Sequence, residues 1–166
     1  MMNQMTPFYQ DLDIQCKDII QHWDQQLESV EQHTAAGTES RRVKLRPIPL
    51  DATLWDMLKI ANQQLYKFSL SEAYECSFMR YDPGDHYDNP HWDCEEHRLE
   101  NQRKLSFTLM LNDDYQGGEL DVVGEHITAK TGRLIIFPSY LMHRVRPVTE
   151  GTRYVIVGWL LGDPWQ

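Results

Sequence analysis

The chain has 166 residues, a length typical of one domain that can bury a hydrophobic core without disulfide or zinc staples. Its hydrophobic fraction of 41% and its charged fraction of 25% are those of a soluble globular protein, which argues against wholesale disorder. A formal net charge of −9 argues against a nucleic-acid partner and against an anionic membrane surface, because both carry negative charge themselves.

The N-terminal segment has neither the basic head nor the apolar run of a signal peptide. No apolar stretch approaches the roughly 20 residues that span a bilayer. The three cysteines are widely spaced and form no CxxC motif, which indicates free thiols rather than a disulfide framework. We therefore expect a cytoplasmic protein with no membrane partner.

The first 70 residues are expected to be mostly helical support for the rest of the domain. Apolar residues recur near helical spacing over 11–33, and the ThrAlaAlaGlyThr stretch that follows is expected to end this helix. Alternating residues over 41–48 predict a short strand, whose basic side chains we interpret as a solvated face rather than as the mark of an acidic partner. A second helix is expected from Asp51, a good N-cap residue, to about Phe68.

From residue 71 the pattern changes to short β-type runs separated by Gly, Pro, Asn and Asp. Several such runs at short spacing predict a sandwich, a barrel or a jelly roll. We therefore predict a single domain over 1–166 of the α+β class, mainly β, with helical support over 1–70 and a β-core over 71–162. The candidate strands are 72–81, 88–93, 105–112, 118–123, 126–128, 133–138, 143–148 and 153–161, with hairpin signals at 112–118, 131–132 and 149–151.

The triplet His91-Trp92-Asp93 is the first pattern that suggests chemistry. In a strand, residues i and i+2 point to the same face, so an imidazole and a carboxylate project side by side and can take adjacent positions on one metal. Alone, such a triplet is weak evidence, because chance places it in many proteins. The remaining histidines that we interpret as surface or satisfied core residues are His22, His33, His86, His97 and His126.

A third candidate ligand is His143, which has a context of its own. The hairpin after it returns the chain as a strand that begins at Arg153, and we expect this return to place Arg153 on the neighbouring strand. A metal-binding histidine with an arginine somewhat deeper suits a dicarboxylate, whose keto-acid end chelates the metal while its far carboxylate pairs with the guanidinium. Neither His126 nor His97 is followed by an arginine at the same interval.

Two histidines and one carboxylate leave three metal positions open, which is the facial triad of non-haem iron(II) oxygenases. Zinc is the competing metal, because sites with two histidines and a carboxylate also hold zinc in hydrolases. The sequence contains no HExxH motif, and no glutamate beside the ligands is in a recognisable general-base position.

The run MetArgTyrAspProGlyAspHisTyrAspAsnProHisTrpAsp (79–93) resembles the Tyr-x-x-Gly-x-x-Tyr/Phe…His-x-Asp signature of the prolyl 4-hydroxylase-like family of Fe(II)/2-oxoglutarate-dependent dioxygenases. The strand, turn and Gly-Gly-Glu element over 103–120 is similar to that of the same family. The run over 130–139, the segment around His143 and the Gly-x-Arg that ends at Arg153 follow in family order. Together these motifs are highly specific, and they cover about half of the chain.

The resemblance implies a double-stranded β-helix (jelly roll) that encloses the iron, with helices flanking it on the N-terminal side. It also implies Fe(II), 2-oxoglutarate as co-substrate, O2, and ascorbate as a reductant. By the same resemblance, the metal ligands and catalytic residues are His91, Asp93 and His143, and the co-substrate is bound by Arg153 and Tyr81 with a hydroxyl from Ser106 or Thr108.

The sequence departs from the family pattern in two places. Three residues, rather than the usual two, separate Tyr87 from His91, which predicts a bulge at the mouth of the pocket. The anchor for the co-substrate is Arg153, where many collagen-type members carry lysine.

The resemblance implies hydroxylation of a peptidyl proline in a peptide or protein substrate, with release of succinate and CO2. Fold-level resemblance alone does not set the substrate, so a free amino acid or another side chain is the alternative. A non-catalytic jelly-roll module that only binds metal is the alternative from another functional class.

Overall fold

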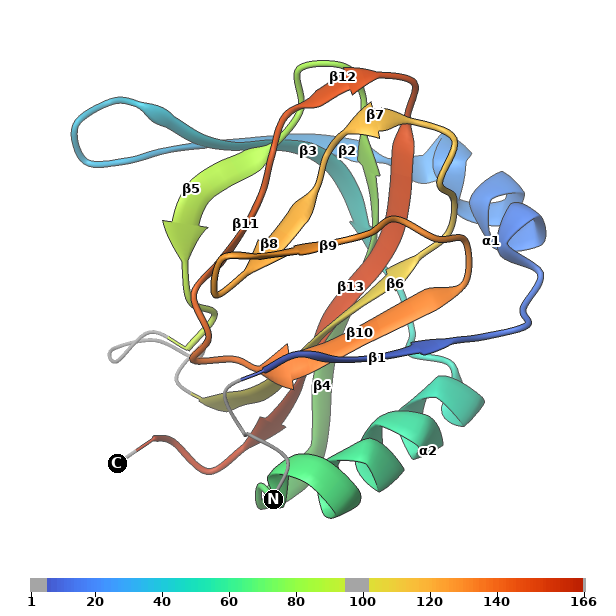
Figure 1. Ribbon diagram of the computed structural model, residues 1–166, viewed down its shortest axis with the longest axis vertical. Helices are drawn as coiled ribbons and strands as arrows, with labels where there is room; N and C mark the ends of the chain where they lie inside the picture. The colour runs from blue at the N-terminus through green and yellow to red at the C-terminus, as the bar shows by residue number, and fades with distance from the viewer. Residues whose placement is uncertain (1–5, 95–101, 166) are drawn as a thin grey trace.

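The computed structural model describes residues 6–94 and 102–165, and β-strands dominate this part of the chain (Figure 1). Seven strands form one sheet in the order β1-β10-β6-β13-β4-β3-β2, and four form a second sheet in the order β5-β11-β8-β9. The short strands β7 and β12 pair with each other, and every strand pair among the described residues is antiparallel. In chain order the elements are β1 (Phe8–Asp11), α1 (Cys16–Trp23), the 3₁₀ turn η1 (Asp24–Gln26), β2 (Glu28–His33), β3 (Glu39–Pro47), α2 (Ala52–Ala61), the π-helical turn η2 (Asn62–Tyr66), β4 (Leu70–Tyr81), β5 (Tyr87–His91), β6 (Arg103–Met110), β7 (Gln116–Gly117), β8 (Leu120–Val122), β9 (Glu125–Ile127), β10 (Arg133–Pro138), β11 (His143–Val145), β12 (Val148–Glu150) and β13 (Arg153–Gly162).

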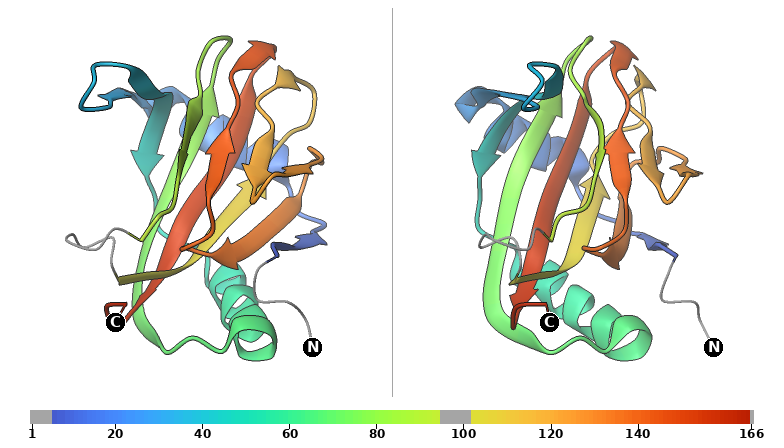
Figure 2. Two further views of the ribbon diagram at one scale, coloured as in Figure 1. Left: turned by 60° about the vertical axis from the view of Figure 1, so that its left-hand side comes forward. Right: turned by 90° about the vertical axis from the view of Figure 1, so that its left-hand side faces the viewer.

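The seven-stranded sheet is covered on both faces, and the side chains of its strands alternate accordingly. In β13, Ile156 and Leu160 join a hydrophobic cluster with Leu58 of α2, on the face that the helices cover. Val155, from the other face of the same strand, packs in a second cluster with Val145 of β11, between the two sheets. Figure 2 shows this layering, with the helices on one side of the large sheet and the smaller sheet on the other.

The predicted helix over 11–33 is wrong over much of its length. Only α1 and the short turn η1 are helical there, and β2 is a strand that pairs with β3, with Val30 opposite Val43. The hydrogen bonds of the sheet therefore outweigh the near-helical spacing of the apolar residues. The ThrAlaAlaGlyThr stretch (34–38) is the turn of this hairpin, where Gly37 takes a positive φ of 81°. Because β1, β2 and β3 all belong to the large sheet, the first 70 residues supply strands as well as helices.

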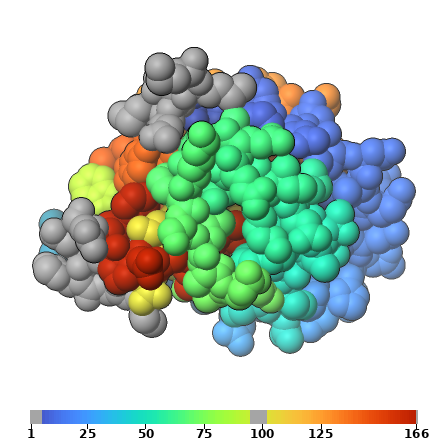
Figure 3. All heavy atoms as spheres, turned by 90° about the horizontal axis from the view of Figure 1, so that it is seen from below, coloured from blue at the N-terminus to red at the C-terminus, as the bar shows by residue number. Residues whose placement is uncertain are grey.

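The predicted strands and the second helix are confirmed, with small shifts of boundary, but the three predicted hairpins are wrong. The turns at 112–118, 131–132 and 149–151 connect strands that pair with other strands and not with each other. Asp51 caps α2, since its Oδ1 accepts a hydrogen bond from the backbone N–H of Leu54 at 3.1 Å. The strand predicted over 118–123 is β8 alone, with β7 just before it, and the one predicted over 143–148 is divided into β11 and β12. Figure 3 shows α2 and the chain that follows it covering the lower end of the molecule. Within the described ranges, no helix is both long and apolar enough to cross a bilayer.

Candidate active site

A cavity of about 540 Å³ lies between the two sheets. Its wall is built from both of them, because β4, β6 and β13 of the large sheet and β5 and β11 of the smaller one send side chains into it. The residues of this wall that bear on function are Arg41, Met79, Tyr81, Tyr87, His91, Asp93, Ser106, Thr108, His143, Arg153 and Trp159.

His91, Asp93 and His143 come together in this cavity, with one ligand atom from each lying within 4.8 Å of the others. The two histidines face each other across neighbouring strands, since His143 of β11 is the register partner of His91 at the end of β5. Asp93 lies just beyond β5, where its backbone N–H donates to the carbonyl of Ser139 at 2.8 Å. The carboxylate of Asp93 is buried, with 7% of its side chain exposed.

Both histidines are held in the same tautomer by their own backbone. Nδ1 of His91 lies 2.8 Å from the carbonyl of Asn89, and Nδ1 of His143 lies 2.8 Å from the carbonyl of Leu141. A carbonyl only accepts, so each Nδ1 carries the donated proton, and each imidazole in its neutral form presents the lone pair of Nε2. The Nε2 atoms lie 3.6 and 3.3 Å from the oxygens of Asp93, so three electron-pair donors converge on one point.

The electrostatics of these three groups differ although they are neighbours. Burial lowers the pKa of His91 to about 4, and the charges of His143 and of Arg41 add to this effect. Burial also opposes ionisation of Asp93 and His143, but their mutual attraction outweighs it, so the pKa of Asp93 is lowered and that of His143 is raised. Without a metal, His91 is therefore neutral near pH 7, and the attraction between Asp93 and His143 favours the charged form of both.

Two buried hydroxyls support the carboxylate of Asp93. Ser106 donates to Oδ2 of Asp93 at 2.6 Å, and its oxygen lies 3.0 Å from that of Ser139. In the structure the hydroxyl of Ser106 donates to a residue of the triad, and its contribution to co-substrate binding stays a prediction. Thr108 is buried and faces the same cavity, and its contribution to co-substrate binding stays a prediction.

The segment from Tyr87 to His91 contains the expected bulge. Four steps along β5, from Tyr87 to His91, lie opposite only two along β11, from Val145 to His143, and the register shifts between them. The Tyr87 ring stacks on the imidazole of His91, with centroids 3.7 Å apart and an interplanar angle of 16°. The bulge thus supplies both the carbonyl of Asn89 and an aromatic wall that hold His91 in place.

Arg153 is fully buried and faces the cavity from the large sheet. Only 1% of it is exposed, and Nε, Nη1 and Nη2 all lack a hydrogen-bond partner among the described residues. Its guanidinium lies 4.9 Å from the centre of the Tyr81 ring, the register partner of Arg153 on β4. The expectation that Arg153 lies on the strand next to His143 is wrong, because β13 belongs to the large sheet and β11 to the smaller one; the two residues meet across the cavity.

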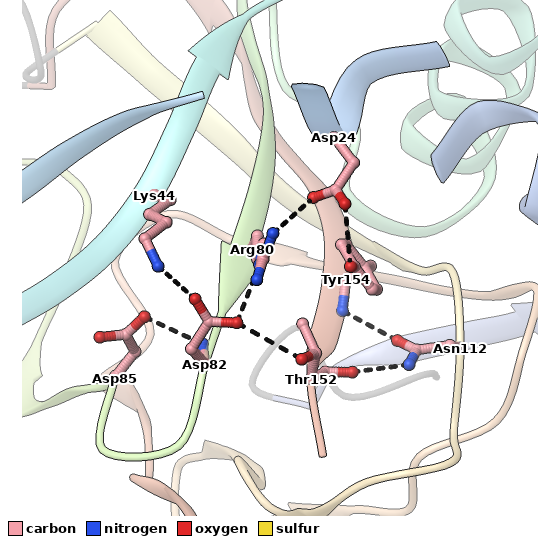
Figure 4. Close-up of polar contacts among 8 residues, drawn as sticks. All are labelled: Asp24, Lys44, Arg80, Asp82, Asp85, Asn112, Thr152 and Tyr154. Carbon is pink, nitrogen blue, oxygen red and sulfur yellow. Dashed lines mark hydrogen bonds and ion pairs between the residues drawn. The ribbon is translucent and has the colours of Figure 1, made fainter. Parts of the chain in front are cut away.

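The backbone on both sides of Arg153 is held by one side chain. The amide of Asn112 donates to the carbonyl of Thr152 at 2.7 Å and accepts from the N–H of Tyr154 at 2.8 Å (Figure 4). Close packing holds the arginine itself, since a Cβ added at Gly118, which has a φ of 64°, would lie 3.0 Å from Cδ of Arg153. The start of β13 therefore has little freedom to turn the guanidinium away.

Figure 4 also shows how this region is tied to the N-terminal part of the chain. Arg80 of β4 pairs with Asp24 of η1 at 3.2 Å and with Asp82 at 2.8 Å, while the hydroxyl of Tyr154 donates to Asp24 at 3.2 Å. Lys44 of β3 pairs with Asp82 as well. These contacts lie on and beside the face of β13 opposite Arg153 and fasten the N-terminal elements to the strands that carry the site.

The other candidate residues lie elsewhere. His126 is exposed and pairs with Asp121, and His97 lies outside the described residues. Arg133, the other arginine near a family motif, pairs with Asp11 and is not part of the cavity wall. The interpretation of the basic side chains over 41–48 as a solvated face is wrong for Arg41, which lies in the cavity wall with a buried Nε. No local pattern in the sequence separates Ser139 from an ordinary loop residue.

Residues 76–161, just over half of the chain, match the family model described as the 2OG-Fe(II) oxygenase superfamily. The chain belongs to this superfamily. Among curated members, a PKHD-type hydroxylase of Rippkaea orientalis is 33% identical over 158 residues, which are 81% of this chain and 69% of the relative. One of Hyphomonas neptunium is 42% identical over 83 residues, or 46% of this chain and 36% of the relative. One of Prochlorococcus marinus is 36% identical over 112 residues, or 61% of this chain and 48% of the relative. The chain thus spans less than half the length of the last two.

Solved structures of prolyl hydroxylases have the same fold as this chain. A prolyl-4-hydroxylase of Pseudomonas putida superposes with a TM-score of 0.72 at 23% identity, covering 95% of this chain and 92% of that one. A prolyl hydroxylase of Trichoplax adhaerens, solved with a peptide fragment of the hypoxia inducible factor oxygen degradation domain, gives 0.69 at 17% identity, covering 93% and 83%. At these identities the likeness shows the fold alone, and it confirms the expected double-stranded β-helix.

Proposed function

We propose that this protein is an Fe(II)- and 2-oxoglutarate-dependent oxygenase that hydroxylates a C–H bond of its substrate and releases succinate and CO2. One observation carries the proposal. The same cavity holds a histidine–carboxylate–histidine set and a guanidinium that is fully buried and has no hydrogen-bond partner among the described residues.

The donor set of His91, Asp93 and His143 fits Fe(II). Two imidazole nitrogens and one carboxylate are the ligands that non-haem iron oxygenases use, and they leave room for a chelating co-substrate and for O2. Both imidazoles offer Nε2 to a metal in their neutral form, because the Nδ1 protons are donated to backbone carbonyls. A zinc hydrolase would need a general base beside the metal, and Asp93 is the one carboxylate in the described wall of the cavity.

The surroundings of Arg153 fit a carboxylate of 2-oxoglutarate. A buried cation with three unpaired nitrogens is strongly unfavourable unless an anion joins it. A bidentate carboxylate matches the fork of a guanidinium and would satisfy two of those nitrogens. Tyr81 lies beside Arg153 on the neighbouring strand, with the centre of its ring 4.9 Å from the guanidinium carbon.

Fe(II) and 2-oxoglutarate, when bound, supply the oxidising chemistry, in which O2 is consumed, 2-oxoglutarate becomes succinate and CO2, and one oxygen atom enters a substrate C–H bond. The chain's part is to bind and orient. Ser106 holds the carboxylate of Asp93 through a hydrogen bond to Oδ2, and Tyr87 holds the ring of His91 by stacking. The buried side chains of Phe137 and Leu120 line the cavity and keep water out.

The substrate we propose is a peptidyl proline. Two of the structural neighbours are named prolyl hydroxylases, and one was solved with a peptide fragment. A free amino acid would need a carboxylate for its ammonium, and the described wall of the cavity offers none besides Asp93. Ascorbate as a reductant and a cytoplasmic location remain predictions.

The experiment is a turnover screen with Fe(II) and 2-oxoglutarate, in which proline-containing peptides and free L-proline are incubated side by side. Succinate is measured together with the mass of each candidate substrate, and Asp93→Ala serves as the inactive control. We expect peptides to stimulate succinate formation more than L-proline does and to gain the mass of one oxygen atom. Oxygen on free proline but on no peptide would refute the peptidyl substrate, and metal binding without any 2-oxoglutarate consumption would favour a non-catalytic module.

A further inference from the structure

Arg41 is the one cation of β3 that points into the cavity. Strand residues alternate, and Val43 and Leu45 on the same face as Arg41 pack in the cluster between the two sheets. The cations on the opposite face have partners outside the cavity. Arg42 pairs with Glu39, Lys44 pairs with Asp82, and Arg46 lies over the ring of Trp23.

Arg41 itself has no acidic partner among the described residues. Its guanidinium lies 5.0 Å from the centre of the Tyr87 ring, and Nη2 lies 3.6 Å from Sδ of Met79. Its Nε is buried without any hydrogen-bond partner in the part of the chain that the structure describes. A half-buried cation held by an aromatic face and a thioether is under-compensated, because neither group carries a charge.

The position of Arg41 connects it to the reacting centre. The Tyr87 ring that lies under its guanidinium stacks directly on the imidazole of His91, at 3.7 Å. One aromatic ring therefore separates this cation from a candidate ligand of the iron. An anion bound to Arg41 would lie beside the metal site without occupying it.

The other charged side chains of the cavity wall have a partner or an assigned role. Arg103 pairs with Glu75 at 2.5 Å, and Arg153 is assigned to 2-oxoglutarate. Asp93 belongs to the triad. Among the described residues of the wall, Arg41 is thus the remaining cation, in a protein whose net charge is −9.

We propose that Arg41 binds a carboxylate of the substrate, so that this oxygenase acts on substrates that carry an acidic group near the hydroxylated carbon. The inference rests on the proposed function and narrows its substrate class. This carboxylate belongs either to the side chain of an acidic residue in a peptide or to a free acid, as its α-carboxylate.

The geometry favours the peptide side chain. A second hollow of about 450 Å³ shares Arg41, Met79, Arg103 and Trp159 with the first, so the space continues past Arg41 along β3 and β4. Nε1 of Trp159, in the part shared by both hollows, is another buried donor without a partner among the described residues. An extended chain can place a proline at the metal site, its acidic neighbour at Arg41, and a backbone carbonyl near Trp159.

The test is isothermal titration of the full chain loaded with Mn(II) and 2-oxoglutarate, because Mn(II) in place of Fe(II) allows binding to be measured without turnover. The probes are short proline-centred peptides with Glu at one flanking position, each matched to the same peptide with Gln. A second pair of probes, L-proline and L-prolinamide, tests whether the α-carboxylate of a small free acid is bound. The proteins are wild type, Arg41→Gln, Arg41→Lys and, as the matched control, Arg46→Gln, which alters an exposed cation on the other face of the same strand.

We expect wild type to bind the best Glu peptide roughly 10- to 100-fold more tightly than its Gln partner, as for one charge-assisted hydrogen-bonded contact. Arg41→Gln should remove this preference without changing the affinity for the Gln peptide, Arg41→Lys should keep part of it, and Arg46→Gln should keep it all. A preference confined to L-proline over L-prolinamide would support the same contact and assign it to a small acid.

Equal affinity of wild type for acid and amide partners in both arms would overturn the inference, as would a preference that survives Arg41→Gln. Loss of 2-oxoglutarate affinity in Arg41→Gln with an unchanged substrate preference would also overturn it and would move Arg41 to the co-substrate site. In each of these cases, succinate formation by wild type with Fe(II) would leave the proposed function standing. Absence of succinate formation with every probe would count against the proposed function, and the binding comparison would still decide the role of Arg41.

Discussion

The substitution Arg153→Met is expected to stabilise the ligand-free protein while it weakens the binding of 2-oxoglutarate. In the structure the guanidinium is 1% exposed, and none of its nitrogens has a hydrogen-bond partner among the described residues. Its one compensating contact there is with the ring of Tyr81. Methionine keeps much of the volume and removes the uncompensated charge.

The two effects have opposite signs and different sizes. Replacing buried charged groups by apolar ones of similar shape is neutral or stabilises by about 1–4 kcal/mol, which for a chain of this length is a rise in Tm on the order of 5 °C. Losing the charge-assisted contact with a carboxylate of 2-oxoglutarate costs about 2–5 kcal/mol of binding free energy, hence a Kd increased about 30-fold or more.

Thermal unfolding with Mn(II), with and without 2-oxoglutarate, measures both effects in one series. Wild type should gain stability from 2-oxoglutarate by mass action, and Arg153→Met should start from a higher Tm and gain little. Arg133→Met is the control for the gain from 2-oxoglutarate, because Arg133 pairs with Asp11 and is not part of the cavity wall. A lower Tm of ligand-free Arg153→Met, or an undiminished gain from 2-oxoglutarate, would refute the assignment of Arg153.

Three further outcomes are expected. Ser106→Ala, which removes the hydrogen bond at 2.6 Å to Asp93, should weaken Mn(II) binding about 10-fold while the fold is retained, as measured by titration calorimetry and circular dichroism. Asn112→Ala, which releases the backbone on both sides of Arg153, should raise the KM for 2-oxoglutarate several-fold and leave Mn(II) affinity unchanged; a loss of metal affinity instead would mean a general structural role. Binding of Mn(II) should strengthen as the pH rises through the raised pKa of His143, with the release of one proton rather than two, because the second imidazole of the triad is already neutral.

The sequence predicted most of the β-core because its strands carry the pattern of a sheet buried on one or both faces. In β13, for example, alternate residues pack toward the helices and toward the cavity, and both sets are apolar apart from Arg153. The failure came at 28–33, where one apolar residue, Val30, falls near helical spacing after α1. Pairing with β3 makes this segment a strand, and this non-local contact cannot be predicted from the spacing of apolar residues.

The metal ligands could be predicted from the sequence more completely than the contacts of the residues around them. The i, i+2 spacing of His91 and Asp93 is local, and the family motif pointed to His143, so the three residues that the structure brings together were named in advance. The contacts around them were not predicted, because the hydrogen bond of Ser106 to Asp93 and the contact of Arg41 with Tyr87 each join residues of separate elements. Such contacts follow from the register of paired strands and from the face that each side chain takes.

The most direct test of whether the triad is the iron site of an oxygenase is the conversion of 2-oxoglutarate to succinate in the presence of Fe(II). The rate of this conversion is compared among wild type, Asp93→Ala, His143→Ala and His126→Ala. We expect wild type and His126→Ala to form succinate at similar rates, because His126 is exposed and pairs with Asp121 away from the cavity. The two triad variants should fall to background and lose their iron, since each removes a ligand of the metal. Near wild-type iron content and succinate formation in either triad variant would contradict the account.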